Sequence, residues 1–199
     1  MFVGDWQNGA SGSRLAFAPD GLLYITTGAP FGDQAQDRNT VYGKVLRLKD
    51  DGTVPKDNPF ARKPGTRPEI YSMGHRDQLG LTIHAPTGRV LTAEHGPNGG
   101  DEINLIVAGR NYGWPRVSFG RDYQGPRISE SPIAPDVEQP IVLSIPSLAA
   151  CPLLRWGPRG LEGPCIHTIC ATAGTNEGST TRIAVVPRRN APAGDFTSC

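Results

Sequence analysis

Residues 94–102 read Glu-His-Gly-Pro-Asn-Gly-Gly-Asp-Glu, and residues 109–115 read Gly-Arg-Asn-Tyr-Gly-Trp-Pro. Gly and Pro at this density force tight turns and leave backbone carbonyls outside any strand ladder. Carbonyls and carboxylates together are the hard oxygen ligands that calcium selects. The stretch therefore predicts either a calcium-binding turn or an ordinary polar loop between two strands.

Two similar hairpins lie upstream of this stretch. Residues 14–28 place two β-prone runs around a Pro-Asp-Gly turn, and residues 81–96 repeat the scheme around Ala-Pro-Thr-Gly. Pro19 and Pro86 mark the same place in the two copies. A hairpin that recurs with variable loops is typical of a β-propeller blade, although such turns occur in many β proteins.

Three further segments are predicted to be strands, and no stretch has sustained helical periodicity with caps. Residues 41–48 alternate as a half-buried strand, and residues 70–73 and 103–107 are shorter β-prone runs. Residues 53–68 contain four prolines and are expected to form an ordered surface loop. The chain is therefore predicted to be all-β.

Composition excludes several classes of function. The 199 residues carry 20 basic and 19 acidic side chains, and this balance gives no reason to expect binding to nucleic acid or to an anionic membrane. No apolar run approaches the roughly 18 residues of a membrane span, and the first residues lack the features of a signal peptide. The 25 Gly and 19 Pro residues favour short strands joined by turns.

The last quarter of the chain differs from the rest. It holds all four cysteines, whose spacings fit no zinc pattern: Cys151, Cys165, Cys170 and Cys199. Strand alternation fades from about residue 144, and residues 171–181 have the composition of a loop. We therefore divide the chain into residues 1–146 and a divergent tail, residues 147–199.

In combination, the motifs resemble those of the soluble quinoprotein sugar dehydrogenases, the glucose/sorbosone dehydrogenase family. They occur in family order, starting with Gly-Ser-Arg-Leu-Ala-Phe-Ala-Pro-Asp-Gly (12–21) and ending with the stretch at 94–115. Between these lie Ala-Gln-Asp (35–37), Gly-Lys-Val-Leu-Arg-Leu (43–48), Asp-Asn-Pro-Phe (57–60) and Gly-His-Arg (74–76). The resemblance implies a six-bladed β-propeller that holds pyrroloquinoline quinone (PQQ) on calcium, oxidises aldose sugars and passes electrons to an acceptor.

The same resemblance assigns roles to individual residues. The carbonyls of Gly96 and Pro97 match ligands of the calcium that carries the cofactor. Arg76 matches the arginine that contacts the quinone, and a planar, permanently charged donor suits an anionic tricarboxylate. Asp77 stands at the next cofactor position, where the family has Asn. A second, structural calcium is expected to bind the Glu102 side chain and the carbonyl of Tyr112.

The chain also departs from the family pattern at four positions. Ala10 stands where the family has its general base, a His, and Ala29 stands where it has the carboxylate partner of that base. Asp77 replaces Asn, and Leu79 replaces a Gln. Loss of a general base removes a factor of about 10²–10⁴ in rate. We therefore expect sugar oxidation by this chain to be weak or absent.

Three interpretations stay open at this stage. The first is a partial sugar dehydrogenase covering roughly the middle blades, periplasmic or secreted as the family resemblance implies. The second is a non-catalytic, calcium-stabilised propeller that binds a sugar or a protein partner. The third is a broken gene product that does not fold well, because an open propeller exposes unpaired strand edges. Separately, the tail is either a divergent segment with real disulfides or the product of a frameshift. Permissible codons for residues 153–163, read one base later, can spell the family segment Cys-Tyr-Gly-Gly-Asp-Arg-Val-Ala-Trp-Lys, and we favour the frameshift.

Overall fold

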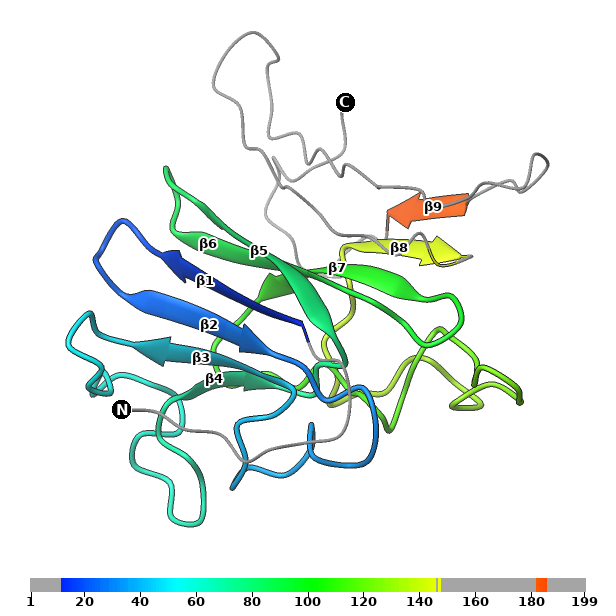
Figure 1. Cartoon of the computed structure of the whole chain (residues 1–199), viewed down its shortest axis with the longest axis horizontal. Coiled ribbons are helices and arrows are strands. Elements are labelled where there is room, and N and C mark those ends of the chain that lie inside the picture. The colour runs from blue at the N-terminus through cyan, green and yellow to red at the C-terminus, as the bar shows by residue number, and fades with distance from the viewer. Residues whose placement is uncertain (1–11, 146, 148–181, 186–199) are drawn as a thin grey trace, which may run out of the picture.

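The computed structural model describes residues 12–145, 147 and 182–185, and contains two antiparallel sheets that lie side by side (Figure 1). The first sheet has four strands in chain order: β1 (Ser13–Phe17), β2 (Leu23–Thr27), β3 (Lys44–Leu48) and β4 (Ile70–Met73). The second has five, also in chain order: β5 (Gln78–His84), β6 (Arg89–Glu94), β7 (Asp101–Ile106), β8 (Val142–Ile145) and β9 (Arg182–Val185). The described residues form no helix, and so none that could cross a membrane. The all-β prediction is confirmed.

Both predicted hairpins are present. In the first, Ala18 donates its N–H to the Leu22 carbonyl at 2.8 Å. Gly21 has a φ of 82°, a backbone conformation that residues other than glycine rarely adopt. In the second, β5 and β6 pair from His84 opposite Arg89 to Gln78 opposite Glu94. The Pro-containing turns therefore join the two strands of each hairpin, as predicted.

The third predicted strand is shorter and more buried than expected. Residues 41–43 are not part of it, and β3 begins at Lys44 after Gly43, whose φ is 67°. Its alternation predicted one solvent-facing side, but all five residues of β3 are buried. Val45 packs in a cluster shared with the second sheet, while Leu46 packs with Phe60 and Ile70 on the opposite face. The prediction of a half-buried strand was wrong because loops cover its outer face.

The proline-rich loop is ordered, as predicted, and one arginine fixes it. Arg47 donates from Nε to Asn58 Oδ1 at 2.7 Å, and Asn58 Nδ2 donates back to the Arg47 carbonyl at 2.9 Å. Asp57 pairs with the same guanidinium at 2.8 Å. These contacts anchor the loop to β3.

Most of the tail lies outside the described residues, so its predicted character is not tested there. The exception is β9, which pairs antiparallel with β8 from Val142 opposite Val185 to Ile145 opposite Arg182. The tail therefore supplies one strand at the edge of the second sheet, where no strand was predicted.

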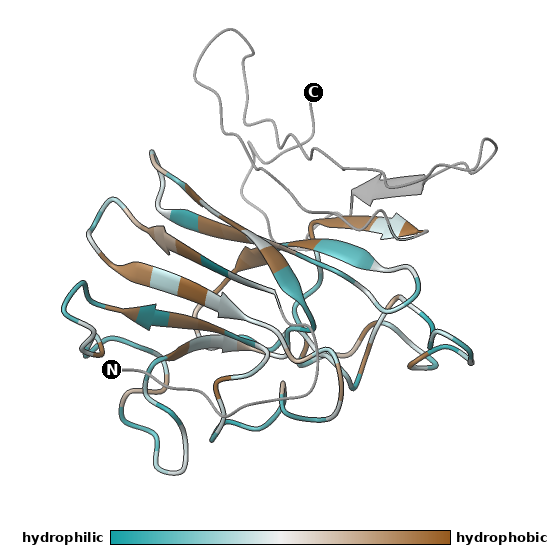
Figure 2. Ribbon diagram, in the orientation of Figure 1, coloured by the Kyte–Doolittle hydropathy of each residue, from teal (hydrophilic) through white to brown (hydrophobic). Residues whose placement is uncertain are grey.

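The interface between the two sheets has an apolar end and a polar end. The apolar end is formed by Tyr24, Val45, Val90 and Ile106. The polar end follows on the same face of β6 and β7, where every second residue is polar: Thr92 opposite Asn104, then Glu94 opposite Glu102. Figure 2 shows that apolar residues concentrate in the strands and polar residues in the loops. A polar layer inside this interface is therefore the exception that calls for a functional account.

Candidate cofactor and cation site

The turn between β6 and β7, residues 95–100, is held from within. Gly96 donates its N–H to Asp101 Oδ1 at 2.9 Å, and Gly99 and Gly100 take φ values of 81° and 79°. A Cβ on Gly100 would lie 2.7 Å from the backbone nitrogen of Gly120, so no larger residue fits there. The glycines thus allow a second loop to seat directly on the turn.

Arg76 binds the carbonyl side of this turn. Its Nη1 donates to the carbonyls of His95 at 3.0 Å and Gly96 at 2.9 Å. The arginine backbone is fixed as well, because its N–H donates to Glu94 Oε2 at 3.2 Å and its carbonyl accepts from Ala29 at 2.6 Å. We call Arg76 with the carbonyls of His95 and Gly96 the arginine cradle.

Two aromatic rings flank the guanidinium of the cradle. Its Cζ lies 5.2 Å from the Trp114 ring centroid and 5.9 Å from that of Tyr123, and Nη2 donates to the Tyr123 hydroxyl at 3.0 Å. Arg76 is buried, and its Nε has no hydrogen-bond partner among the described residues. A planar cation between aromatic faces, with one donor unused, suits a planar anionic ligand.

Two carboxylates meet across the β6–β7 pair, beside the cradle. Asn104 Nδ2 bridges them, donating to Glu94 Oε1 at 3.0 Å and to Glu102 Oε2 at 3.1 Å. Asn104 is fully buried, and its Oδ1 has no partner among the described residues. We call Glu94, Glu102 and Asn104 the carboxylate pocket.

The electrostatics of the carboxylate pocket favour a proton or a cation. Burial raises the pKa of Glu94 to about 7, against the opposing effect of the Arg76 backbone N–H. Burial raises the pKa of Glu102 well above its usual range, and the neighbouring Glu94 charge adds to that shift. Two like charges in one low-dielectric site cannot both ionise without a counter-charge.

A buried histidine backs the carboxylate pocket. His75 Nδ1 lies 3.3 Å from Glu94 Oε2, and its Nε2 lies 2.8 Å from Ser72 Oγ. The ring stacks on Tyr112 at 4.5 Å between centroids. This order of residues matches a Ser-His-acid triad, but Ser72 is fully buried and no substrate could reach its hydroxyl. Burial lowers the pKa of His75 to about 3, so the ring stays neutral and fills the space between Glu94 and Ser72.

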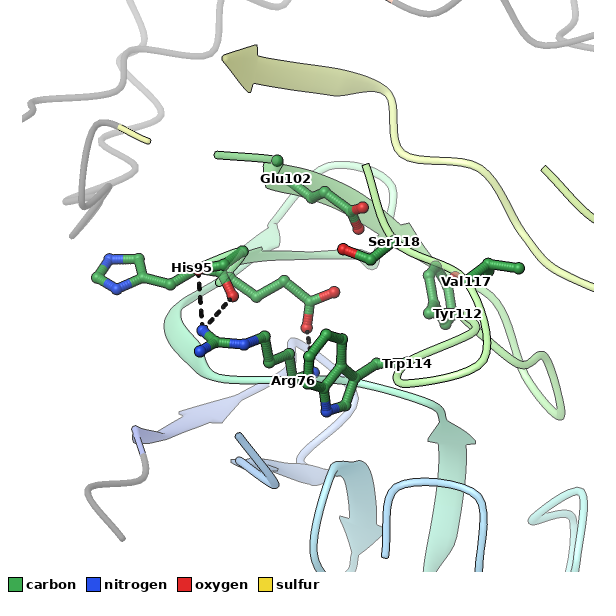
Figure 3. Close-up of a pocket in the computed structure, with 10 residues that line it drawn as sticks. Arg76, His95, Glu102, Tyr112, Trp114, Val117 and Ser118 are labelled. Atoms are coloured by element: carbon green, nitrogen blue, oxygen red, sulfur yellow. Dashed lines mark hydrogen bonds between the residues drawn. The ribbon is translucent and has the colours of Figure 1, made fainter. Parts of the chain in front are cut away.

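The arginine cradle, Glu94 and Glu102 line one open cavity (Figure 3). Figure 3 shows the Arg76 guanidinium on one side of this cavity and Glu102 on another, with Tyr112, Trp114, Val117 and Ser118 around the remainder. Across the described residues no three His, Cys, Asp or Glu side chains converge as metal ligands. A cation here would therefore depend on the two carboxylates and on backbone oxygens.

The structure brings most predicted site residues together. Arg76 and Gly96 touch, and Glu102 and Tyr112 line the same cavity. Pro97 packs under Gly120, where an added Cβ would lie 2.8 Å from its ring. Asp77 differs from its predicted surroundings, because its Oδ1 accepts the N–H of Gly12 at 2.6 Å and so ties the start of β1 to β5.

The two positions that match the family's catalytic His and its carboxylate partner are Ala10 and Ala29. Ala10 lies outside the described residues. Ala29 is buried in a small apolar cluster with Ala35 and Trp114, and its carbonyl accepts from Trp114 Nε1 at 2.7 Å. Its methyl group supplies no carboxylate for orienting a base.

No described histidine takes over as a base facing the cavity. His75 is fully buried. His84 lies in the β5–β6 hairpin, where its Nδ1 is 2.6 Å from Thr87 Oγ1. The His95 ring points away from the cavity (Figure 3).

Sequence reasoning missed three residues of the site. Glu94 begins the stretch at residues 94–102, but the sequence analysis assigned it no role. Its pairing with Glu102 follows from antiparallel register across a short turn. Asn104 was placed in a strand, and only the same register puts it beside both acids. Tyr123 carried no local signal, because its position depends on the bridge between Asn98 and Arg121.

Comparison with known proteins agrees with the motifs. The model of the Glucose / Sorbosone dehydrogenase family matches residues 5–156. The chain is 42% identical over 135 residues to aldose sugar dehydrogenase YliI of Escherichia coli, covering 65% of this chain and 36% of that protein. It is 42% identical over 141 residues to quinoprotein glucose dehydrogenase B of Acinetobacter calcoaceticus, covering 61% of this chain and 28% of that protein.

Solved structures give the same picture. The apo form of the soluble aldose sugar dehydrogenase from Escherichia coli matches with a TM-score of 0.61 and 40% identity, over 64% of this chain and 38% of that one. The PQQ-bound aldose sugar dehydrogenase from Streptomyces coelicolor matches with a TM-score of 0.52 and 35% identity, over 66% of this chain and 34% of that one. The chain thus spans about a third of the length of the relatives it matches.

Proposed function

The chain belongs to the glucose/sorbosone dehydrogenase family, and on that premise we propose that it is part of a PQQ- and calcium-dependent aldose sugar dehydrogenase. The observation that carries the proposal is the arginine cradle. Residues 20 apart in sequence converge so that the Arg76 guanidinium binds the carbonyl of Gly96 at 2.9 Å. Both were expected at a cofactor site from the motifs alone.

The residues present fit the two groups that the family implies. The unused Nε of Arg76 and the rings of Trp114 and Tyr123 suit a planar anion such as PQQ. The carbonyls of Gly96 and Pro97 suit the calcium that carries it. Glu102, with the unpartnered Oδ1 of Asn104 nearby, suits the second calcium. When bound, PQQ would supply the two-electron acceptor for sugar oxidation.

The chain's own residues would bind and orient rather than abstract protons. Arg76 would hold the cofactor's negative charge, while Glu94 and Ala29 fix the arginine backbone from both sides. A general base must lie within about 2.6–3.2 Å of the sugar hydroxyl, and Ala29 offers no partner for one. We therefore propose that turnover by this chain is weak.

The proposal extends to the larger protein of which the matched region is a part. The first sheet and strands β5–β8 of the second are antiparallel, run in chain order and touch through β1 and β5, which suits successive blades of a six-bladed propeller. The tail strand β9 adds a fifth strand to the second sheet. Residues 1–146 would then cover roughly the middle blades, followed by a divergent or frameshifted tail. A periplasmic or secreted location, an aldose substrate and a separate electron acceptor belong to the same proposal.

A second candidate function is a non-catalytic, calcium-stabilised propeller that binds a sugar or a protein partner. The buried methyl group of Ala29 favours it, because the catalytic carboxylate position has become part of an apolar cluster. The carboxylate pocket is independent of that position. In this candidate function the protein binds the cation but does not oxidise a sugar.

Two measurements on the same sample test the proposal. PQQ should quench the fluorescence of Trp114 in the presence of calcium, and Arg76→Gln should weaken that binding by about tenfold or more, as loss of a charge-assisted contact predicts. Dye reduction with an aldose then measures turnover. Binding without turnover favours the second candidate, and no binding by the parent chain contradicts both PQQ and the enzyme proposal.

A repair experiment addresses catalysis directly. In a chain completed with the remaining blades, Ala10→His together with Ala29→Asp should raise turnover more than either change alone, because a His–carboxylate pair works as a unit. Equal turnover in the unrepaired completed chain would mean that another residue serves as the base.

A further inference from the structure

The loop that follows β7 contains a short hairpin, residues 120–128. Its ends meet where Ile128 donates its N–H to the Gly120 carbonyl at 3.4 Å. Inside it, Arg121 and Arg127 lie directly opposite each other in an antiparallel bridge. Residues paired in this way project their side chains from the same face, with Cβ atoms about 4.5–5.5 Å apart. We call residues 120–128 the arginine hairpin.

The two opposed arginines repel each other, because like charges directly opposite on paired strands are destabilising. Both side chains are exposed, and within the part of the chain that the structure describes neither forms an ion pair. The one acid of the hairpin, Asp122, packs at its tip, where a Cβ added to Gly125 would lie 3.1 Å from the Asp122 Cβ. The arginine pair therefore costs the hairpin stability and calls for a functional account.

The arginine hairpin is fixed beside the arginine cradle. Arg121 exchanges two backbone hydrogen bonds with Asn98 in the turn between β6 and β7, at 3.1 and 3.2 Å. Tyr123 accepts a hydrogen bond from Arg76 Nη2 at 3.0 Å, although Tyr123 itself is 59% exposed. The paired arginines thus belong to the solvent-facing surroundings of the expected cofactor site.

We propose that Arg121 and Arg127 bind an anionic group of the substrate, so that the protein favours aldoses that carry a carboxylate or a phosphate over neutral aldoses. This inference rests on the proposed function and narrows its substrate class. Guanidinium groups bind carboxylates and phosphates through paired, charge-assisted hydrogen bonds. An anion placed between the two arginines is attracted by both and offsets their mutual repulsion. The exposed ring of Tyr123, two residues from Arg121, offers an apolar surface to the sugar.

The exposure of the pair favours the substrate over the cofactor as the source of this anion. Arg76, which is expected to hold the cofactor, is buried and keeps an unused Nε. Arg121 and Arg127 are exposed instead. A group bound by them stays at the surface, as suits the end of a sugar that is remote from the carbon being oxidised.

Ligand-detected NMR of sugars, with PQQ and calcium present and no electron acceptor, tests the pair through binding alone. Glucuronate or glucose phosphorylated at its terminal carbon should bind the parent chain roughly tenfold more tightly than glucose, as a hydrogen bond to a charged group predicts. Comparison of the two anionic sugars distinguishes carboxylate from phosphate. Arg127→Gln should lose most of the preference. Arg116→Gln removes another exposed arginine, one that pairs with Asp136, and should keep it.

Melting curves with inorganic phosphate test the anion site without any cofactor. Phosphate should raise the melting temperature of the parent chain and of Arg116→Gln more than that of Arg127→Gln, because only the first two keep the opposed pair. In the absence of phosphate, Arg127→Gln should melt slightly above the parent chain, since the repulsion is gone.

Several results would overturn the proposal. Equal affinities of the parent chain for charged and neutral sugars would do so, and so would an unchanged preference in Arg127→Gln. A loss of PQQ affinity in Arg127→Gln, with sugar binding unaffected, would assign the pair to the cofactor instead. If the parent chain binds no PQQ, the proposed function fails. The pair then stands as an anion site if phosphate stabilises the parent chain more than Arg127→Gln, and falls if it does not.

Discussion

The two ends of the interface between the sheets differ in chemistry although the same strands form both. At one end Val90 and Ile106 face Tyr24 and Val45, and burial of these side chains follows the ordinary hydrophobic pattern. At the other end, two residue pairs along the same face, the buried Glu94 meets the half-buried Glu102. The apolar end accounts for stability, and the polar end is retained at a cost to stability.

Truncation at the apolar end should give the largest effect. Ile106→Ala removes a buried side chain from the cluster between the sheets and should lower the free energy of unfolding by about 2–5 kcal/mol. Urea denaturation measures the loss. Ile133→Ala makes the same chemical change at an exposed position and should cost less than about 0.5 kcal/mol. Similar losses in the two variants would mean that the interface is not a packed core.

Cation binding at the polar end should come next in size. Calcium at 100 times its dissociation constant should add about 2.7 kcal/mol to the stability of the parent chain. Glu102→Gln should remove most of that gain, while Glu130→Gln, at an exposed position, should keep it. Melting curves with calcium and with chelator provide the measurement. An unchanged curve on chelation of the parent chain would argue against a cation at this end.

The pH dependence of stability should separate the two ends further. Glu94 and Glu102 have raised pKa values when folded, so their protonated forms favour folding below an unfolded pKa of roughly 4.3. That contribution is lost as pH rises through the folded pKa of Glu94, about 7. Without cation, the parent chain should therefore lose stability relative to Glu102→Gln as the pH rises from 5 to 8, because the variant lacks the Glu102 charge.

Comparison with a variant is needed because His75 titrates in the opposite sense. Its folded pKa is lowered to about 3, so its contribution is present above about 6.5 and is lost on acidification. His75 is common to both chains and cancels in the difference between their unfolding free energies. A difference that stays flat with pH would show that the two acids do not share a low-dielectric site.

The smallest effect is expected where the chain departs from its family at Asp77. Asp77 Oδ1 accepts the Gly12 N–H at 2.6 Å, and an Asn carbonyl could accept the same bond. Asp77→Asn should therefore change the free energy of unfolding by no more than about 0.5 kcal/mol, whereas Asp77→Ala should cost about 1–2 kcal/mol. Thermal unfolding of the two variants distinguishes a hydrogen-bonding role from a role of the charge itself.

Local structure follows from short-range patterns in the chain. Two hairpins, the strand at residues 70–73 and the absence of helix in the described part follow from turn residues and from alternation, which act within a few neighbours. The ordered motifs also identified the family, because their spacing is a property of the chain alone. The alternation of residues 41–48 failed as a guide to burial, since it cannot reveal which loops will cover the outer face of β3.

Assembly of the site depends on how distant elements pack together. Arg76 reaches Gly96 because the β4–β5 connection lies beside the β6–β7 turn, and Tyr123 reaches Arg76 because a distant loop bridges to Asn98. Glu94 and Glu102 share a pocket through strand register, and Ala29 is enclosed by packing against Trp114. Each of these contacts joins residues whose separation in space depends on how whole elements pack, and no local pattern of side chains encodes that distance.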